Sequence, residues 1–146
     1  MGSPILSFEN VTYKYPDGTI ALKDISFSIE QGKKIALIGN NGAGKSTLFL
    51  LLNGILKPAA GSIKFKDKKL TYTRKEIRQI RKQVGIVFQN PETQLFSSSV
   101  YEDIKFGPKN LGINPEELEK TVKEAMILTE TETLKEKPPH FLSIGQ

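Results

Sequence analysis

Residues 39–47 read Gly39-Asn40-Asn41-Gly42-Ala43-Gly44-Lys45-Ser46-Thr47, and this stretch decides the fold. Its first eight residues fit the pattern G-x-x-x-x-G-K-[S/T], which is typical of a phosphate-binding P-loop. The apolar run 34–39 before it predicts a strand buried on both faces, and the leucine-rich run 45–56 after it predicts a helix. A strand, a glycine-rich loop and a helix in this order are the context that the pattern requires.

Each residue type in this loop suits the binding of phosphate. Glycines let the backbone approach closely and point successive N–H groups at phosphate oxygens, and the following helix presents its positive end. The Lys45 side chain can reach the β- and γ-phosphates, and the Ser46 hydroxyl can bind Mg²⁺. We therefore predict a nucleoside triphosphate site at Gly39, Asn40, Asn41, Gly42, Ala43, Gly44, Lys45 and Ser46.

The flanking sequence predicts an α/β chain. Apolar residues in 5–13 and their rough alternation in 20–29, separated by the turn signal 15–19, predict an antiparallel pair of strands. Residues 62–67 alternate as an edge strand does, and the apolar run 84–88 predicts a second buried parallel strand. Two more helices are expected over 73–83, with Thr73 as cap, and from Asn114-Pro115 onwards.

Composition excludes several classes of protein. The 146 residues include no cysteine and one histidine, which excludes a disulfide scaffold, a Cys-zinc site, a thiol nucleophile and a His-rich metal centre. The longest apolar run, 48–52, is far shorter than the roughly 20 residues that a membrane-spanning helix needs. A globular domain with a formal net charge of +5 remains.

Three motifs together resemble the ATP-binding-cassette (ABC) ATPases over the whole chain. Residues 39–47 resemble the Walker A loop, 87–89 end an apolar strand with glutamine as the Q-loop does, and 142–146 (LSIGQ) resemble the signature motif LSGGQ. The resemblance implies a P-loop NTPase fold of the ABC type. It further implies an ATP-binding core with an antiparallel β subdomain over residues 1–97, and a helical subdomain over 98–146 that ends at the signature motif.

A longer string is similar to the energy-coupling-factor branch of this family, the importers of cobalt, nickel and vitamins. It comprises QNPETQLF at 89–96, then Val100, Glu102-Asp103 and Phe106-Gly107-Pro108. This resemblance implies an ATP-binding subunit at the cytoplasmic face of the membrane, using ATP and Mg²⁺. The implied partners are a transmembrane coupling subunit, a substrate-binding membrane subunit and a second ATPase subunit, identical or different.

The resemblance also assigns roles to individual residues. Lys45 and Gln89 would act in catalysis, with Ser46 and Gln89 on Mg²⁺ and Thr47 completing the Walker A loop. Tyr15 would stack on adenine, since a flat ring offers area without demanding hydrogen bonds; Tyr13 is the alternative. Ser143 and Gly145 would contact the γ-phosphate bound to the opposite subunit, so that one complete site needs two chains.

The sequence departs from the family pattern in two places. Ile144 stands where the signature motif has glycine, and we expect its φ to be negative because a β-branched residue adopts positive φ only at a cost. The family's aspartate, glutamate and switch histidine follow the signature motif, beyond Gln146, and His140 precedes it in an expected solvated loop. We therefore expect the N-terminal part of such an ATPase, without its C-terminal core strands and without hydrolysis on its own.

A basic stretch between residues 64 and 82 allows three interpretations. The stretch contains nine cations and two acids. Aromatic interleaving is limited to Phe65 and Tyr72, and this favours a solvated surface over a nucleic-acid site. Attraction to anionic lipid is the third interpretation. The nine cations are Lys64, Lys66, Lys68, Lys69, Arg74, Lys75, Arg78, Arg81 and Lys82.

Two other functions of the chain also stay open: an ATP-binding fragment without hydrolysis, and a non-transport ABC ATPase associated with nucleic acid or the ribosome. We expect no nucleic-acid partner.

Overall fold

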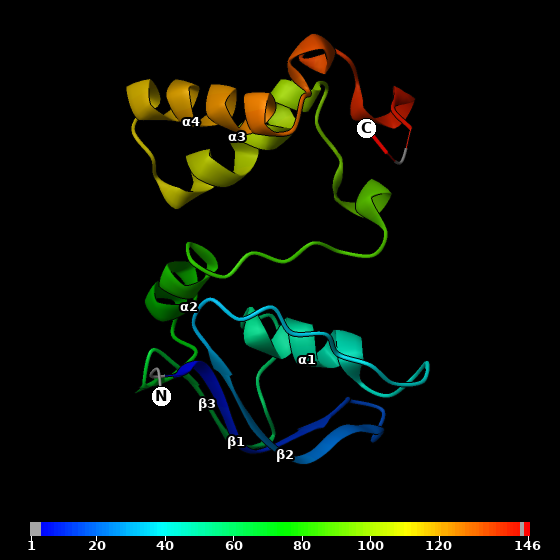
Figure 1. The fold of residues 1–146 in the computed structure, drawn as a ribbon, viewed down its shortest axis with the longest axis vertical. Helices are drawn as coiled ribbons and strands as arrows, with labels where there is room; N and C mark the ends of the chain where they lie inside the picture. The colour runs from blue at the N-terminus through cyan, green and yellow to red at the C-terminus, as the bar shows by residue number, and fades with distance from the viewer. Residues whose placement is uncertain (1–3, 144) are drawn as a thin grey trace. The chain divides into compact units, whose positions relative to one another are not determined.

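The computed structural model describes residues 4–143 and 145–146, and the expectation for Ile144 lies outside them. The chain divides into two compact units, Met1–Ile86 and Val87–Gln146, each of which is described by itself (Figure 1). This division falls before the subdomain boundary that the sequence predicts after residue 97. Residues 87–97 are therefore grouped with the helices that follow them.

The first unit contains a four-stranded antiparallel sheet. Its strands are β1 (Pro4–Lys14), β2 (Ile20–Glu30), β3 (Ala60–Phe65) and β4 (Lys68–Lys69), in the order β2-β1-β3-β4. The predicted antiparallel pair and its turn are confirmed, with Gly18 N donating to Tyr15 O at the turn. The prediction of an edge strand at 62–67 is wrong, because β3 pairs on both sides and the two-residue β4 forms the edge.

The register of the sheet brings aromatic and β-branched side chains together. Phe8 on β1 pairs with Phe27 on β2 and Ile63 on β3, and the two phenyl rings stack at 4.6 Å between centroids. Val11 and Ile63 are fully buried. Cross-strand pairs of this kind are the main source of sheet stability, so these residues anchor the core of the unit.

Helix α1 (Lys45–Leu52) follows the glycine-rich loop and packs on the sheet (Figure 1). Leu48, Leu51 and Leu52 are buried in the same cluster as the strand residues. The helix ends four residues earlier than the predicted 45–56. Its end coincides with Asn53 and with Gly54, whose φ of +68° is a left-handed conformation that suits glycine.

Helix α2 (Arg74–Arg81) and the end of α1 are held by specific contacts. Thr73 caps α2 by accepting a hydrogen bond from Glu76 N, as predicted, and Ile80 is buried. The buried Asn53 donates from Nδ2 to Val84 O at 2.6 Å. This bond fixes the segment after α2 to the end of the P-loop helix.

The two predicted buried strands, 34–39 and 84–88, are wrong for the described structure. Neither forms a strand, and Ile38 and Val87 are 91% and 97% exposed. A central strand needs neighbours that supply hydrogen bonds and cover both faces. The sheet of the described residues consists only of β1–β4, and it supplies no such neighbour.

The second unit is built on a helical hairpin of α3 (Val100–Leu111) and α4 (Pro115–Leu128) (Figure 1). Ser99 caps α3, Asn114 caps α4 as predicted, and Gly112 ends α3 at φ +80°. Short 3-10 turns flank the hairpin: η1 (Pro91–Gln94), η2 (Glu132–Leu134) and η3 (Pro139–Phe141). The core consists of Val100, Leu118, Val122, Met126 and Leu134. Within the described residues, no helix is both long and apolar enough to cross a bilayer.

Candidate nucleotide-binding site

The backbone of the glycine-rich loop requires two of its glycines. Gly42 and Gly44 both have φ +82°, in the left-handed region. A Cβ atom on Gly44 would also lie 2.6 Å from the carbonyl oxygen of Ala21 on β2. Gly44 therefore lets the loop turn into α1 while passing close to the sheet, and any other side chain would displace the loop.

Lys45 closes this loop from inside. Its Nζ atom donates hydrogen bonds of 2.7 Å to Gly39 O and to Asn40 O, and Ala43 N donates to Asn40 O at 3.2 Å. The ammonium group thus lies at the centre of the loop, next to the N–H groups that begin α1. Those first N–H groups have no acceptor within the helix, and this combination suits a bound phosphate.

Ser46 and Thr47, adjacent in sequence, face different surroundings. Ser46 is exposed at the start of α1, so its hydroxyl is available to a ligand. Thr47 is buried, and its Oγ1 atom lies 2.8 Å from the hydroxyl of Tyr15. Thr47 therefore joins the P-loop helix to the segment after β1, a contact that the sequence pattern does not reveal.

The two tyrosines considered for adenine stacking occupy different positions. Tyr13 is buried in the core, whereas Tyr15 is half-buried at its margin, and their rings meet edge to face at 5.0 Å between centroids. A ring that stacks on a nucleotide base needs an open face. The positions are consistent with Tyr15 in that role and Tyr13 as core.

The remaining predicted site residues belong to the second unit. Gln89 is exposed in the segment before η1. Ser143 is exposed, and both its N–H and its hydroxyl donate to Gln146 Oε1, at 3.1 and 3.3 Å; Gly145 is exposed beside them. The structure brings residues 39–47 and Tyr15 together within one unit, and Ser143 with Gly145 in the other. Their meeting in one nucleotide site stays a prediction.

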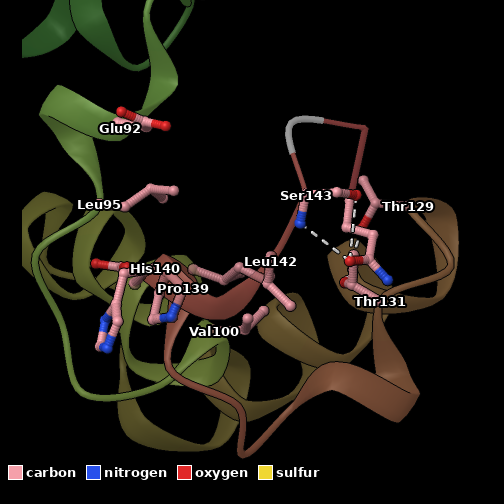
Figure 2. A pocket seen from close by; sticks show the side chains of 12 residues that line it. Glu92, Leu95, Val100, Thr129, Thr131, Pro139, His140, Leu142 and Ser143 are labelled. Carbon is pink, nitrogen blue, oxygen red and sulfur yellow. Dashed lines mark hydrogen bonds between the residues drawn. The ribbon is translucent and has the colours of Figure 1, made fainter.

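The second unit contains a pocket of about 620 Å³ next to Ser143 (Figure 2). Leu95, Val100 and Leu142 give it an apolar lining, and Asp103 lies among them. Asp103 Oδ1 accepts from Ser97 N at 3.1 Å, and its buried Oδ2 has no hydrogen-bond partner among the described residues. In the sequence, Asp103 stands out only as part of the resemblance to the energy-coupling-factor branch, because the hydropathy pattern does not reveal a buried carboxylate oxygen.

The donor set fits Mg²⁺ only together with a nucleotide. The described residues include no group of three or more His, Cys, Asp or Glu side chains that would hold a metal ion alone. Mg²⁺ in phosphate sites is bound by one or two protein oxygens, phosphate oxygens and water. The exposed Ser46 hydroxyl at the end of the loop fits that requirement.

Comparison with known proteins agrees with this geometry. Residues 22–146 match the sequence profile of the ABC transporter family. The chain belongs to the ABC transporter family. The sequence-derived resemblance and fold class are thereby confirmed.

Several ABC relatives carry energy-coupling-factor names. The chain is 51% identical over 142 residues to the energy-coupling factor transporter ATP-binding protein EcfA of Methanococcus maripaludis, covering 97% of this chain and 51% of that protein. It is 50% identical to EcfA3 of Clostridium perfringens, covering 97% and 50%. The chain therefore spans about half the length of the curated relatives it matches.

Solved ABC structures share the fold. The structure of cbiO1 from Clostridium perfringens, part of the ABC transporter complex cbiONQ, has a TM-score of 0.83 and 50% identity, covering 98% of this chain and 57% of that one. The dimeric, post-hydrolysis ATP-binding cassette MJ0796 bound to ADP and Pi has a TM-score of 0.81 and 25% identity, covering 94% and 63%.

Proposed function

We propose that this chain is the N-terminal part of the ATP-binding subunit of an energy-coupling-factor importer. ATP binding and hydrolysis by the whole subunit would drive uptake of a cobalt or nickel ion or a vitamin. The observation that carries the proposal is the closed loop of residues 39–47, with Gly42 and Gly44 at φ +82° and Lys45 Nζ at its centre. The likeness to EcfA relatives supports the branch.

In this proposal each residue of the site has a defined contact with the nucleotide, Mg²⁺ or water. Lys45 exchanges its two carbonyl partners for β- and γ-phosphate oxygens, and the N–H groups at the start of α1 bind the same phosphates. Ser46 and Gln89 are the residues that would hold Mg²⁺, which when bound neutralises charge that develops on the phosphates. Gln89 also orients the attacking water, and Tyr15 positions the adenine.

The complete site would take residues from two subunits. Ser143 and Gly145 are exposed at the signature motif. To contact a γ-phosphate held by a second ATPase subunit, the N–H and hydroxyl of Ser143 would exchange their acceptor, Gln146 Oε1, for phosphate oxygens. The dimeric MJ0796 cassette supports such an arrangement for this chain. The 146-residue chain alone would bind ATP without measurable turnover, because the family's general base and Mg²⁺-binding aspartate follow the signature motif.

The surface for the transmembrane coupling subunit would lie in residues 89–107. Leu95 and Phe96 are 44% and 66% exposed, and Phe96 meets Phe106 edge to face at 4.8 Å between centroids. Val100, by contrast, is buried in the core of the helical unit, and Ile104 packs against that core. We assign the contact to Leu95, Phe96 and Phe106, beside the pocket of Figure 2. The subunit would then sit peripherally at the cytoplasmic face of the membrane.

A paired hydrolysis measurement tests the proposal. The full-length protein is reconstituted with its membrane subunits, and Mg²⁺-dependent phosphate release is compared with that of the purified 146-residue chain. We expect turnover by the former, its loss in Lys45→Ala, and background by the latter. Sustained hydrolysis by the 146-residue chain that Lys45→Ala abolishes would contradict the proposal that turnover needs residues that follow the signature motif.

A further inference from the structure

Helix α2 (Arg74–Arg81) presents a continuous basic stripe. At about 100° per residue, Arg74, Lys75, Arg78, Arg81 and the C-cap residue Lys82 fall within an arc of roughly 120°. Ile80, the buried residue of the helix, lies on the opposite side, and all five cations are exposed. We define these five residues as the basic stripe.

The acid of this helix, Glu76, is hydrogen-bonded to Thr71. Glu76 lies outside the arc, and its Oε2 atom accepts a hydrogen bond from Thr71 N at 2.6 Å and another from Thr71 Oγ1. Arg74, Lys75 and Lys82 form no salt bridge with any residue that the structure describes. These three cations of the stripe therefore present positive charge that no described acid pairs with.

The sheet edge extends this charge. Lys66 Nζ donates to Gln83 Oε1 at 2.6 Å, which holds the turn between β3 and β4 against the end of α2. The exposed Lys68 and Lys69 form β4, the edge of the sheet. Among the cations of this region, Lys64 is bound to an acid, Glu9.

We propose that the basic stripe is a docking surface for the anionic headgroups of a phospholipid bilayer. The choice of a membrane over RNA rests on the proposed function, which places the protein beneath its membrane subunits. The aromatic residues of the region also argue against RNA. Single-stranded RNA is held largely by stacking on exposed rings. Phe65 is buried and Tyr72 is half-buried, so neither offers a free ring face.

The attachment is electrostatic. The apolar side of α2 packs against the core of its own unit, so the helix has no apolar face to insert into the bilayer. Binding through headgroup charge alone decays within a Debye length, about 10 Å at 0.1 M salt. It is therefore reversible and salt-sensitive, and it orients the subunit with α2 towards the membrane surface.

Vesicle flotation of the full-length protein tests the proposal. The probes are vesicles of phosphatidylcholine alone and of phosphatidylcholine with 30% phosphatidylglycerol. The stripe variant is Arg74→Gln/Lys75→Gln/Lys82→Gln, and the charge-matched control is Lys109→Gln/Lys123→Gln/Lys137→Gln, three exposed lysines of the helical unit. At about fivefold per basic residue, we expect the stripe variant to lose roughly 100-fold in partition to anionic vesicles, and the control less than about threefold.

The alternative outcomes are distinct. Equal partition to both kinds of vesicle, or equal loss in the two triple variants, would overturn the proposal. Binding of a single-stranded RNA oligonucleotide that the stripe variant loses, without vesicle binding by the wild type, would overturn it in favour of nucleic acid. ATP binding by the stripe variant should equal that of the wild type, which shows that it is folded. If the wild-type protein hydrolyses ATP but does not bind anionic vesicles, this inference alone is refuted. If the wild-type protein binds anionic vesicles through the stripe but does not hydrolyse ATP, the proposed function is refuted.

Discussion

The hydroxyl group of Tyr15 lies 2.8 Å from Oγ1 of Thr47, and this contact ties the segment after β1 to the P-loop helix. The ring and the hydroxyl of Tyr15 thus have separable roles. The ring is available to a nucleotide base, while the hydroxyl stabilises the fold around the loop.

Two substitutions of Tyr15 separate these roles. Tyr15→Phe keeps the ring, so we expect ATP affinity to stay within about twofold while the free energy of unfolding falls by about 1 kcal/mol. Tyr15→Ala should also weaken ATP binding by about 1–3 kcal/mol, by analogy with base stacking on aromatic side chains. Calorimetric titration and urea unfolding measure the two quantities. Loss of affinity in Tyr13→Ala with none in Tyr15→Ala would assign the stacking to Tyr13.

Lys45→Ala removes the ammonium group that contacts Gly39 O and Asn40 O. Hydrogen bonds to charged groups contribute about 1.5–3 kcal/mol each, so ATP affinity should fall at least tenfold in a fluorescence titration. Lys34→Ala, an exposed lysine just before the loop, serves as control and should leave affinity unchanged. Equal affinities of Lys45→Ala and the wild type would show that phosphate binds elsewhere.

Gly44→Ala and Gly32→Ala compare steric contact at similar backbone angles. Their φ values are +82° and +77°, but only Gly44 has a backbone oxygen within 2.6 Å of an added Cβ; Gly32 has nothing within 4 Å. Left-handed geometry costs alanine about 1–2 kcal/mol, which we expect in full for Gly32→Ala. Gly44→Ala should destabilise further and abolish ATP binding. Similar unfolding midpoints for the two variants would contradict the close approach to Ala21.

Leu95→Asp and Phe96→Asp test the surface proposed for the coupling subunit. Both side chains are exposed, so the full-length protein should fold and bind ATP while co-purification with its membrane subunits is lost. Ile127→Asp and Leu128→Asp on α4 form the control pair, since these side chains are 49% and 84% exposed. Normal assembly of the Leu95 and Phe96 variants would place the contact elsewhere.

Tyr72→Phe should stabilise the first unit. The Tyr72 hydroxyl is buried without a hydrogen-bond partner among the described residues, and burial, with the nearby Glu76 carboxylate, raises the pKa of Tyr72 to about 12. Removing an unsatisfied hydroxyl should raise the free energy of unfolding by about 1 kcal/mol. Tyr15→Phe, which deletes a bonded hydroxyl, should change it in the opposite direction. Destabilisation by Tyr72→Phe would indicate a partner for this hydroxyl.

Local signals in the sequence predicted the parts of the fold that depend on neighbouring residues. The caps Thr73 and Asn114, the turn at Tyr15–Gly18 and the glycine-rich loop are specified by a few adjacent residues, and all form as expected. The runs 34–39 and 84–88 were misjudged because a buried strand depends on partner strands, which an apolar run does not guarantee.

The candidate site likewise has a part that the sequence predicts and a part that it does not. Motif spacing predicts the P-loop, whereas the Tyr15–Thr47 bond joins positions 32 residues apart and has no pattern in the sequence. The burial of the Oδ2 atom of Asp103 and the bond from Asn53 to Val84 also depend on tertiary packing. The sequence shows that α2 is rich in basic residues, but their position on one face follows from where the helix begins and ends.

The exposed residues Ile35, Leu37 and Ile38 border an apolar groove of about 310 Å³ with Phe49, and this groove affects how the chain behaves at high concentration. Contiguous apolar surface promotes self-association, and the resulting oligomers need no nucleotide. A dimer of the 146-residue chain is therefore evidence for paired ATPase subunits only if ATP promotes it and Ile38→Ser or Phe49→Ser leaves it intact. Light scattering over a dilution series, with and without ATP, distinguishes colloidal clustering from the assembly that transport would use.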